Sequence, residues 1–251
     1  MLVDTHCHIH EADYPLPVAD VLKRAAEADV GKMILVGTNE KSSEDAIMLA
    51  AKHDDLYATV GVHPHDAKDG IAKIAELAKR DVVAVGEIGL DYYYNHSPRE
   101  IQIVALESQI QTALDNDLPI IFHVRDAFVD FWPIFDNFQS VSRRIRGELH
   151  SFTDTQANLD KAFERGLYVG VNGISTFTKD PEQQRLYANI PPERILLETD
   201  APFLTPAPYR GTINEPAYVS EIAKFHAAKR GISIDEIAAV TTANANELFR
   251  F

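Results

Sequence analysis

Cysteine is almost absent from this chain, because Cys7 is the only one among 251 residues. A single cysteine excludes an internal disulfide, and it also excludes a zinc site built from several thiolates. Long apolar runs are absent too, since no uninterrupted stretch reaches the length of about 18 residues that a membrane-spanning helix needs. The first residues, Met1-Leu2-Val3-Asp4, carry an acid at once and so differ from a secretory signal. We therefore expect a cytoplasmic protein without a membrane segment.

Basic residues are scarce relative to acidic ones. The chain has 24 Lys and Arg against 38 Asp and Glu, which gives a formal net charge of -14. This balance argues against a protein that holds nucleic acid on a broad basic face. It does not exclude a phosphate substrate, because two bound divalent cations would add about four positive charges inside a pocket. No feature of the sequence indicates an obligate protein partner.

Short apolar runs rich in β-branched residues alternate with longer amphipathic stretches along the whole chain. Eight such runs, each followed by a helical pattern, predict parallel strands joined by crossover helices. Their number favours an α/β fold of the (β/α)8 TIM-barrel type over an open doubly wound sheet. No Pro-, Gly- or Ser-rich linker divides the chain, so we expect residues 1–251 to form one domain. The predicted strands are residues 2–6, 32–37, 57–62, 82–86, 119–123, 147–150, 167–171 and 194–198.

Two of the predicted helices have recognisable first turns. Residues 97–100 and 233–236 both match the capping box, in which a serine and a glutamate three residues later satisfy each other's backbone N–H groups. After the first box, one helical face carries Ile101, Val104, Ala105 and Ser108. Elsewhere, the spacing of Val219, Ile222, Ala223 and His226 is that of a core-facing stripe, so we expect His226 to be packed rather than a ligand.

Histidines and carboxylates gather where the predicted strands end. Side chains in such positions can converge, because the carboxyl ends of the strands in a parallel barrel open into one mouth. Neutral imidazoles and carboxylates are the ligands of a hydrolytic divalent-metal site. No Walker A loop, dinucleotide-binding glycine motif or G-x-S-x-G elbow offers another catalytic scheme. The clusters are Asp4-Thr5-His6-Cys7-His8, Gly61-Val62-His63-Pro64-His65, Gly86-Glu87-Ile88-Gly89-Leu90-Asp91, Phe122-His123-Val124-Arg125, Leu149-His150-Ser151-Phe152 and Glu198-Thr199-Asp200.

The clusters divide between two expected ions. His6 and His8 are separated by one residue, so in an extended strand both side chains lie on the same face and can chelate one ion. Glu87 has two carboxylate oxygens and can therefore bridge two ions. The second ion would be held by this bridge together with two histidines from neighbouring strands, His123 and His150. Two ions roughly 3.5–4 Å apart would clamp a phosphate and stabilise both the attacking and the leaving oxygen.

Asp200 follows the last predicted strand, which lies beside the first strand when a barrel closes. From there its carboxylate can complete the shell of the first ion. We also expect Asp200 to act as a general base that accepts a proton from the attacking water. The alternative is that Asp200 is a ligand alone.

Taken in order, these motifs closely resemble the TatD family, whose members are metal-dependent deoxyribonucleases within the amidohydrolase-like barrels. The match covers essentially the whole chain, from Met1 to the closing segment Thr242-Ala243-Asn244-Ala245-Asn246-Glu247-Leu248-Phe249. The resemblance implies that one ion is held by His6, His8, Glu87 and Asp200. It implies that the other is held by Glu87, His123 and His150. Related amidohydrolases often bridge their metals with a carboxylated lysine after the fourth strand, so Glu87 at this place favours the nuclease branch.

Four further residues are expected to contact the substrate. His63 and His65 either donate hydrogen bonds to it or pack around Pro64. Arg125 follows a ligand by two residues on the same face, as a phosphate clamp would. Arg210 fits the pattern of the family, whereas the family usually carries a basic or polar pair where this chain has Thr212 and Ile213. Because of that departure, the sequence does not establish one contact with a phosphate or with the nucleic-acid strand.

The leading hypothesis is a divalent-metal-dependent phosphodiester hydrolase, a DNase or exonuclease that trims DNA at free ends or in single strands. The first alternative is hydrolysis of another bond by the same core, such as an aminoacyl-tRNA ester, a lactone or an amide. The second is a metal-holding barrel without catalysis. The native metal (Mg²⁺, Mn²⁺ or Zn²⁺) and the choice between DNA and RNA stay open. The run Tyr92-Tyr93-Tyr94 either offers base-stacking surfaces or simply packs.

Overall fold

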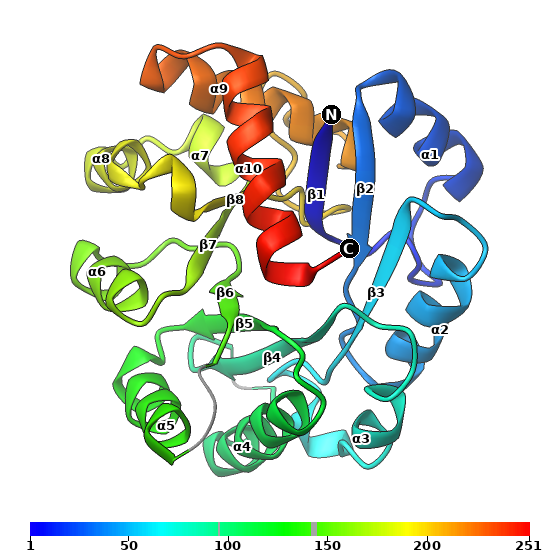
Figure 1. Cartoon of the computed structure of the whole chain (residues 1–251), viewed down its shortest axis with the longest axis vertical. Helices are drawn as coiled ribbons and strands as arrows, with labels where there is room; N and C mark the ends of the chain where they lie inside the picture. Colours follow the sequence, from blue (N-terminus) through cyan, green and yellow to red (C-terminus); the bar gives the residue numbers. More distant parts are fainter. Residues whose placement is uncertain (95, 142–144) are drawn as a thin grey trace. The chain divides into compact units, whose positions relative to one another are not determined.

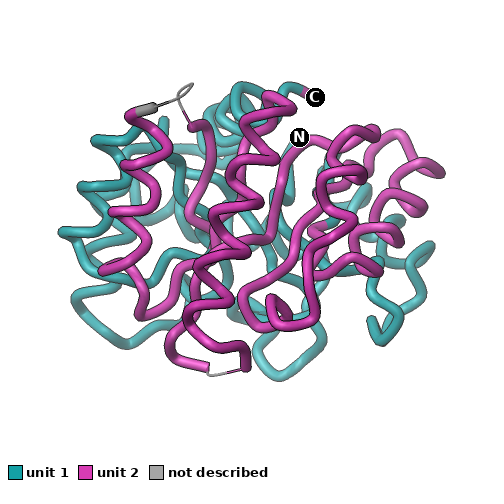
Figure 2. The backbone as a smooth tube through the Cα atoms, turned by 90° about the horizontal axis from the view of Figure 1, so that it is seen from below, with its two compact units in different colours: residues 1–35, 151–250 teal, residues 36–150, 251 magenta. Residues whose placement is uncertain are grey.

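The computed structural model describes residues 1–94, 96–141 and 145–251. Strands and helices alternate along the chain, and the strands follow one another in chain order from β1 to β8 (Figure 1). Eight parallel strands in this order, joined by helices, form a (β/α)8 barrel, so the predicted fold class is confirmed. Within the chain two compact units are distinguished, unit 1 (residues 1–35 and 151–250) and unit 2 (residues 36–150 and 251; Figure 2). The single domain expected for residues 1–251 stays a prediction.

Unit 1 contains two pairs of parallel strands, β1 with β2 and β7 with β8. A parallel bridge between Cys7 and Ala201 also joins the end of β1 to the segment that follows β8. Its strands are β1 Leu2–Cys7, β2 Val30–Leu35, β7 Tyr168–Val171 and β8 Ile195–Leu197. Its helices are α1 Val18–Glu27, α6 Gln156–Glu164, α7 Ile174–Phe177, α8 Pro181–Asn189, α9 Val219–Arg230 and α10 Ile234–Phe249, with 3-10 turns η2 Pro192–Arg194 and η3 Pro216–Tyr218.

Unit 2 contains four consecutive parallel strands, in which β4 pairs with β3 and β5, and β5 pairs with β6. Its strands are β3 Leu56–Val60, β4 Ala84–Asp91, β5 Ile120–Arg125 and β6 Gly147–Leu149. Its helices are α2 Glu40–Ala50, α3 Ile74–Leu77, α4 Arg99–Asp115 and α5 Phe128–Val141, with the 3-10 turn η1 Ala67–Asp69.

Strand β4 is longer than the sequence pattern predicts. The pattern predicts a strand over residues 82–86, yet β4 runs from Ala84 to Asp91 with all eight residues buried. The pattern stops at Gly86 because glycine usually weakens a strand. Here the glycines allow close approach instead, since a Cβ atom on Gly89 would overlap the carbonyl oxygen of His123 in β5. Glu87 therefore lies inside a strand rather than after one.

Helix α4 begins and faces differently from the prediction. Ser97 does not cap it, because the Ser97 hydroxyl donates to the carbonyl of His65 at 2.6 Å and Pro98 precedes the helix without a side-chain cap. The face of Ile101 and Val104 is turned outward, with 40% and 64% of these residues exposed. The buried face carries glutamines as well as apolar side chains, and this mixture hides the helix orientation from a hydrophobic pattern.

Other helix predictions agree with the structure. Ser233 and Glu236 form the expected capping box at the start of α10. His226 is buried in α9, where its Nε2 lies 3.0 Å from the hydroxyl of Ser175. Among the described residues, no helix combines the length and the apolar character that crossing a membrane requires.

Candidate metal centre

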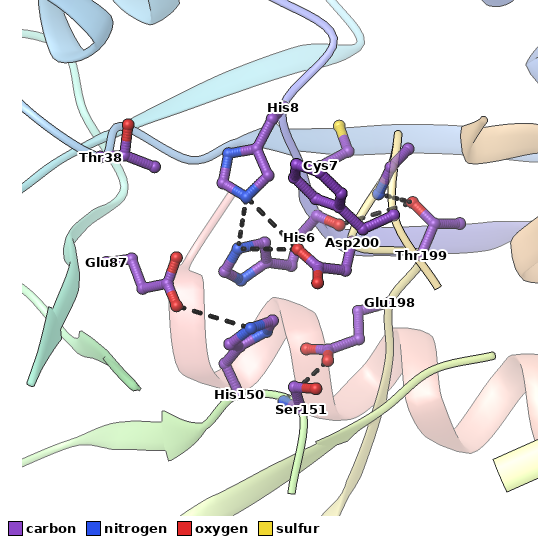
Figure 3. Close-up of polar contacts among 12 residues, drawn as sticks. His6, Cys7, His8, Thr38, Glu87, His150, Ser151, Glu198, Thr199 and Asp200 are labelled. Carbon is purple, nitrogen blue, oxygen red and sulfur yellow. Dashed lines mark hydrogen bonds and ion pairs between the residues drawn. The ribbon is translucent and has the colours of Figure 1, made fainter. Parts of the chain in front are cut away.

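Three ligand atoms meet at the end of β1 in unit 1. His6 lies within β1, His8 is one residue beyond it, and Asp200 follows β8. The Nε2 atoms of His6 and His8 are 3.2 Å apart (Figure 3). The Oδ1 atom of Asp200 lies 3.3 Å from His8 Nε2 and 3.8 Å from His6 Nε2. The structure thus brings two histidines near the start of the chain, His6 and His8, together with a carboxylate almost 200 residues later, Asp200.

The backbone of the β1–β8 junction fixes this group. The N–H of Asp200 donates to the carbonyl of His6 at 2.8 Å, and the N–H of His8 donates to the carbonyl of Ala201 at 2.8 Å. Asp200 has a φ of 58°, in the left-handed region that aspartate adopts more readily than most residues. Because these bonds join the two segments directly, the side chains are placed by the sheet rather than by a mobile loop.

Asp4 supports the same group from within β1. Its buried carboxyl accepts the N–H of Thr199 at 2.8 Å and the Thr199 hydroxyl at 2.6 Å. Burial raises the pKa of Asp4 to about 8, and the hydrogen bonds from Thr199 oppose that rise. Asp4 therefore holds the residue that directly precedes Asp200.

Glu198 is a further buried acid at the end of β8. Its Oε1 accepts the N–H of Ser151 at 2.8 Å (Figure 3). The same oxygen accepts from the side-chain amide of Asn172 at 3.1 Å. These two donors orient the carboxylate of Glu198 in unit 1.

A second group surrounds Glu87 in unit 2. The Oε1 atom of Glu87 lies 2.8 Å from Nδ1 of His123, 3.5 Å from Nε2 of His150 and 3.6 Å from Nε2 of His63. Burial holds the pKa of His63 well below its usual value, although the charge of Glu87 works against this. The imidazole of His63 is therefore neutral, which is the form that can bind a cation.

Asp91, at the end of β4, is a second carboxylate beside this group. Its Oδ2 lies 2.8 Å from Nε2 of His65 and 3.2 Å from Nε2 of His123, while its Oδ1 accepts the N–H groups of Tyr93 and Tyr94 at 2.9 Å each. Burial would raise the pKa of Asp91, but the hydrogen bonds from His123, Tyr94 and His65 hold it well below its usual range. For His123, burial would lower the pKa, but the hydrogen bonds with Asp91 and Glu87 raise it.

The donor atoms of both groups fit divalent cations. Such ions bind imidazole nitrogen and carboxylate oxygen at about 2.0–2.2 Å, which places neighbouring donor atoms about 3 Å apart. The spacings among His6, His8 and Asp200 are 3.2, 3.3 and 3.8 Å. In unit 2, one ligand atom each from His63, Glu87 and His123 lie within 4.8 Å of one another. Each unit therefore carries a set of nitrogen and oxygen atoms, from buried and half-buried side chains, that is suited to holding a cation.

Two arginines expected to contact substrate have different surroundings. The guanidinium of Arg125, at the end of β5, lies over the rings of Tyr93 and Tyr94. Arg210 donates to the carbonyl of Thr205 at 2.7 Å and lies 3.8 Å from the ring centre of Phe177. Both arginines are exposed; Arg210 contacts Thr205 and Phe177 of its own unit, whereas Arg125 lies beside the group around Glu87.

The sequence pattern alone does not identify three acids of these groups as site residues, namely Asp4, Asp91 and Glu198. A signal was present, because each stands in or closes a strand-end motif that also holds a predicted ligand. Their partners are backbone N–H groups and side chains distant in sequence, such as Thr199 for Asp4 and His65 for Asp91. Only the folded chain shows these partners.

Comparison with known proteins places the chain in a family. The family model described as TatD related DNase matches residues 3–250. The chain belongs to this family. Membership makes it a metal-dependent hydrolase, and it agrees with the resemblance in the strand-end motifs.

Relatives and solved structures match this member of the TatD-related DNases over nearly its full length. The metal-dependent hydrolase YabD of Bacillus subtilis (strain 168) is 36% identical over 255 residues, covering 100% of this chain and 99% of YabD. The 3′-5′ ssDNA/RNA exonuclease TatD of Erwinia amylovora is 37% identical over 241 residues, covering 91% of this chain and 92% of that protein. The crystal structure of YJJV, a TatD homologue from Escherichia coli K12, has a TM-score of 0.91 at 28% identity and covers 100% of this chain and 98% of that one.

Proposed function

We propose that this hydrolase cleaves phosphodiester bonds of DNA, acting on free ends or single strands with two divalent cations. The observation that carries the proposal is the meeting of histidine nitrogens with carboxylate oxygens in each unit, around Asp200 and around Glu87. The relatives named as 3′-5′ ssDNA/RNA exonucleases support a nucleic-acid substrate and extend it to RNA. The net charge of -14 agrees with this, because cations rather than a basic surface would then meet the phosphate.

Each unit would contribute the ligands of one ion. His6, His8 and Asp200 would hold the first, and Glu87, His123 and His150 the second. The additional role of Glu87 as a bridge to the first ion stays a prediction. When bound, the ions would lower the pKa of a water and stabilise charge on the phosphate.

The chain's own residues would position the substrate and move the proton. Asp200 would accept the proton of the attacking water, since a carboxylate beside a cation can act as a general base. His63 and His65 would contact the phosphate oxygens of the substrate, and Asp91 Oδ2, 2.8 Å from Nε2 of His65, would orient the His65 ring. Arg125, exposed beside them, would attract the next phosphate along the strand.

The proposal is tested with end-labelled single- and double-stranded DNA and RNA of one sequence. The protein is stripped with a chelator and then refilled with Mg²⁺, Mn²⁺ or Zn²⁺. We expect no cleavage after stripping and progressive shortening of single-stranded DNA after refilling with at least one ion. The His123→Ala variant, purified in parallel, controls for a contaminating nuclease.

The proposal is wrong if the refilled protein binds metal yet cleaves none of these nucleic acids with any ion. Lactones, amides and aminoacyl-tRNA are then the substrates to try. Activity on one of them would show that the protein hydrolyses another type of bond. No activity on any of them would favour a barrel without catalysis.

A further inference from the structure

Two adjacent aromatic side chains stand exposed at the end of β4. Tyr93 is 58% exposed and Tyr94 is 43% exposed, although tyrosine buries a large apolar ring where it can. Tyr92 separates them from Asp91 in sequence, but Asp91 accepts both of their backbone N–H groups, so they lie beside the histidines that this carboxylate contacts. The ring of Tyr94 is also 5.6 Å from the ring of His65. These exposed rings are therefore neighbours of the group around Glu87.

The turn that carries the two rings is tied to that group by a single carboxylate. Asp91 accepts the N–H groups of Tyr93 and Tyr94 with Oδ1 and contacts His65 and His123 with Oδ2. Asp91 is itself 1% exposed, and its own N–H donates to the side chain of Gln102 at 2.8 Å. Two backbone hydrogen bonds thus fix the turn, and an aromatic surface that is ordered before binding loses little entropy when a ligand binds to it.

Arg125 completes the surface from the neighbouring strand. Its guanidinium carbon lies 4.1 Å from the ring centre of Tyr93 and 4.9 Å from that of Tyr94. Asp91 and Arg125 are paired residues in the register of β4 and β5, which explains why the cation reaches these rings. Among the described residues, no carboxylate oxygen lies within 4.0 Å of this guanidinium. Its positive charge is therefore available to an anion from outside.

Tyr92, in the same run, has partners within the protein for both its hydroxyl group and its ring. Its hydroxyl donates to Asp130 at 2.6 Å, and the guanidinium of Arg99 lies 4.7 Å from its ring centre. Arg99 is in turn bonded to Asp130, so charge and ring are both paired within the protein. Tyr93 and Tyr94 differ from Tyr92 because their arginine lacks such an acid and both side chains are exposed. The ring of Tyr94 also stacks on that of His96, with ring centres 5.7 Å apart, so Tyr93 offers the more open aromatic face.

We propose that Tyr93, Tyr94 and Arg125 form a subsite that stacks an unpaired nucleobase of the substrate and contacts the phosphate next to it. The inference rests on the proposed function and names the part of the substrate that this surface recognises. Bases of any kind present a flat face that stacks on tyrosine, and a guanidinium binds phosphate by charge and hydrogen bonds. A base inside a duplex already stacks on its neighbours, so this surface favours single strands and frayed ends.

The first experiment measures binding without catalysis. A labelled thymidine oligonucleotide and an abasic oligonucleotide of the same length are titrated with the full chain in chelator, and fluorescence anisotropy is recorded. The double variant Tyr93→Leu/Tyr94→Leu keeps apolar bulk but removes the aromatic faces, whereas Tyr93→Phe/Tyr94→Phe keeps the faces. Tyr92→Phe is the matched control, and thermal unfolding followed by circular dichroism checks that each variant is folded.

We expect the leucine variant to bind the thymidine oligonucleotide about tenfold more weakly or worse, with the abasic oligonucleotide unaffected. The phenylalanine variant and Tyr92→Phe should bind both as the unmodified protein does. Arg125→Gln should weaken both oligonucleotides, because both carry phosphates. Equal losses for the two oligonucleotides in the leucine variant, or no loss at all, would overturn the stacking subsite.

The second experiment separates failure of this inference from failure of the proposed function. The metal-loaded protein is given the single-stranded thymidine oligonucleotide and, separately, the abasic oligonucleotide of the same length, which has phosphodiester bonds but no aromatic rings. We expect the leucine variant to show a raised KM for the thymidine oligonucleotide and an unchanged KM for the abasic one. If the unmodified protein hydrolyses neither, the proposed function fails. If it hydrolyses both and the leucine variant matches it on the thymidine oligonucleotide, only the subsite fails.

Discussion

Asp200 is the residue whose role is most sharply testable. Its carboxylate lies 3.3 Å from His8 and 3.8 Å from His6, close enough to share a cation with both. Asp200→Asn keeps an oxygen that can coordinate weakly but removes the group that takes up a proton. We expect turnover to fall by about 100-fold or more even at saturating metal.

The measurement is the rate of oligonucleotide cleavage across a metal titration. Asp130→Asn is the control, since Asp130 pairs with Tyr92 and Arg99 and takes no part in the proposed chemistry. Recovery of nearly the full rate at high metal would leave Asp200 as a ligand alone.

Glu87 and His123 should differ in how much metal their loss releases. One oxygen of Glu87 is surrounded by three histidines, and the resemblance assigns this carboxylate to both ions. We expect Glu87→Gln to lower the content of both ions and His123→Ala to lower mainly one. Metal content is measured by elemental analysis after equilibrium dialysis. Near-normal content and turnover in both variants would contradict this division of ligands.

Helix α4 has glutamines where a barrel helix usually has apolar side chains. The side chain of Gln109 is 1% exposed; it accepts the N–H of Val62 at 2.7 Å and donates to the carbonyl of Val62 at 3.2 Å. Gln109→Leu would leave both backbone groups buried without these bonds. We expect the free energy of unfolding to fall by about 1–3 kcal/mol, as measured by urea denaturation.

Gln111→Leu is the matched control for this helix. Gln111 is exposed and donates to Asp115 at 2.8 Å, four residues along the same helix. Its replacement should change the free energy of unfolding by no more than about 0.5 kcal/mol. Similar losses in the two variants would show that helix propensity, rather than the bonds to Val62, is responsible.

Helix α9 carries a buried histidine that should make stability depend on pH. Burial lowers the pKa of His226 to about 3, and the nearby charge of Arg230 lowers it further. The Nδ1 of His226 accepts from Arg230 at 2.8 Å, so the folded protein keeps this imidazole neutral. Between pH 6.5 and about 3 the unfolded chain binds one proton more than the folded chain at this site. The stability it contributes is therefore complete above pH 6.5 and is lost as pH falls towards 3.

The test compares the unmodified protein with His226→Gln, whose amide oxygen can still accept from Arg230. We expect the free energy of unfolding of the unmodified protein to fall more steeply with decreasing pH, by up to about 1.4 kcal/mol per pH unit. Denaturant unfolding at several pH values gives this difference. Parallel curves for the two proteins would mean that His226 is protonated equally in both states.

For the whole molecule, metal and stability should be linked. Cations that bind the folded chain but not the unfolded chain stabilise it by mass action, by about 2.7 kcal/mol when metal is at 100 times its Kd. We expect chelation to lower the melting temperature and refilling to restore it, as followed by scanning calorimetry. A variant with both Glu87→Gln and Asp200→Asn should show a much smaller response. An unchanged melting temperature after complete removal of metal would contradict buried sites of this kind.

Much of the architecture was predictable because short sequence patterns indicate where its strands and helices lie. Eight apolar runs predicted eight strands in the order observed, since burial on both faces leaves a continuous hydrophobic stretch. Motifs such as those of His6 and Asp200 could be recognised because side chains at strand ends share one edge of the sheet. The capping box of Ser233 was predictable because its partner, Glu236, is only three residues away in the sequence.

The sequence alone therefore determined the fold class, the strand order and the side chains at the strand ends. Only the tertiary structure decided that the Ser97 hydroxyl donates to the carbonyl of His65 instead of capping α4. It also decided that the side chain of Gln109 accepts the backbone N–H of Val62. It alone decided that one oxygen of Asp91 holds the turn of the exposed tyrosines while the other contacts histidines. The physical reason is that apolar periodicity records which side is buried, whereas a hydrogen bond between distant segments has no period and exists only once the backbone has brought them together.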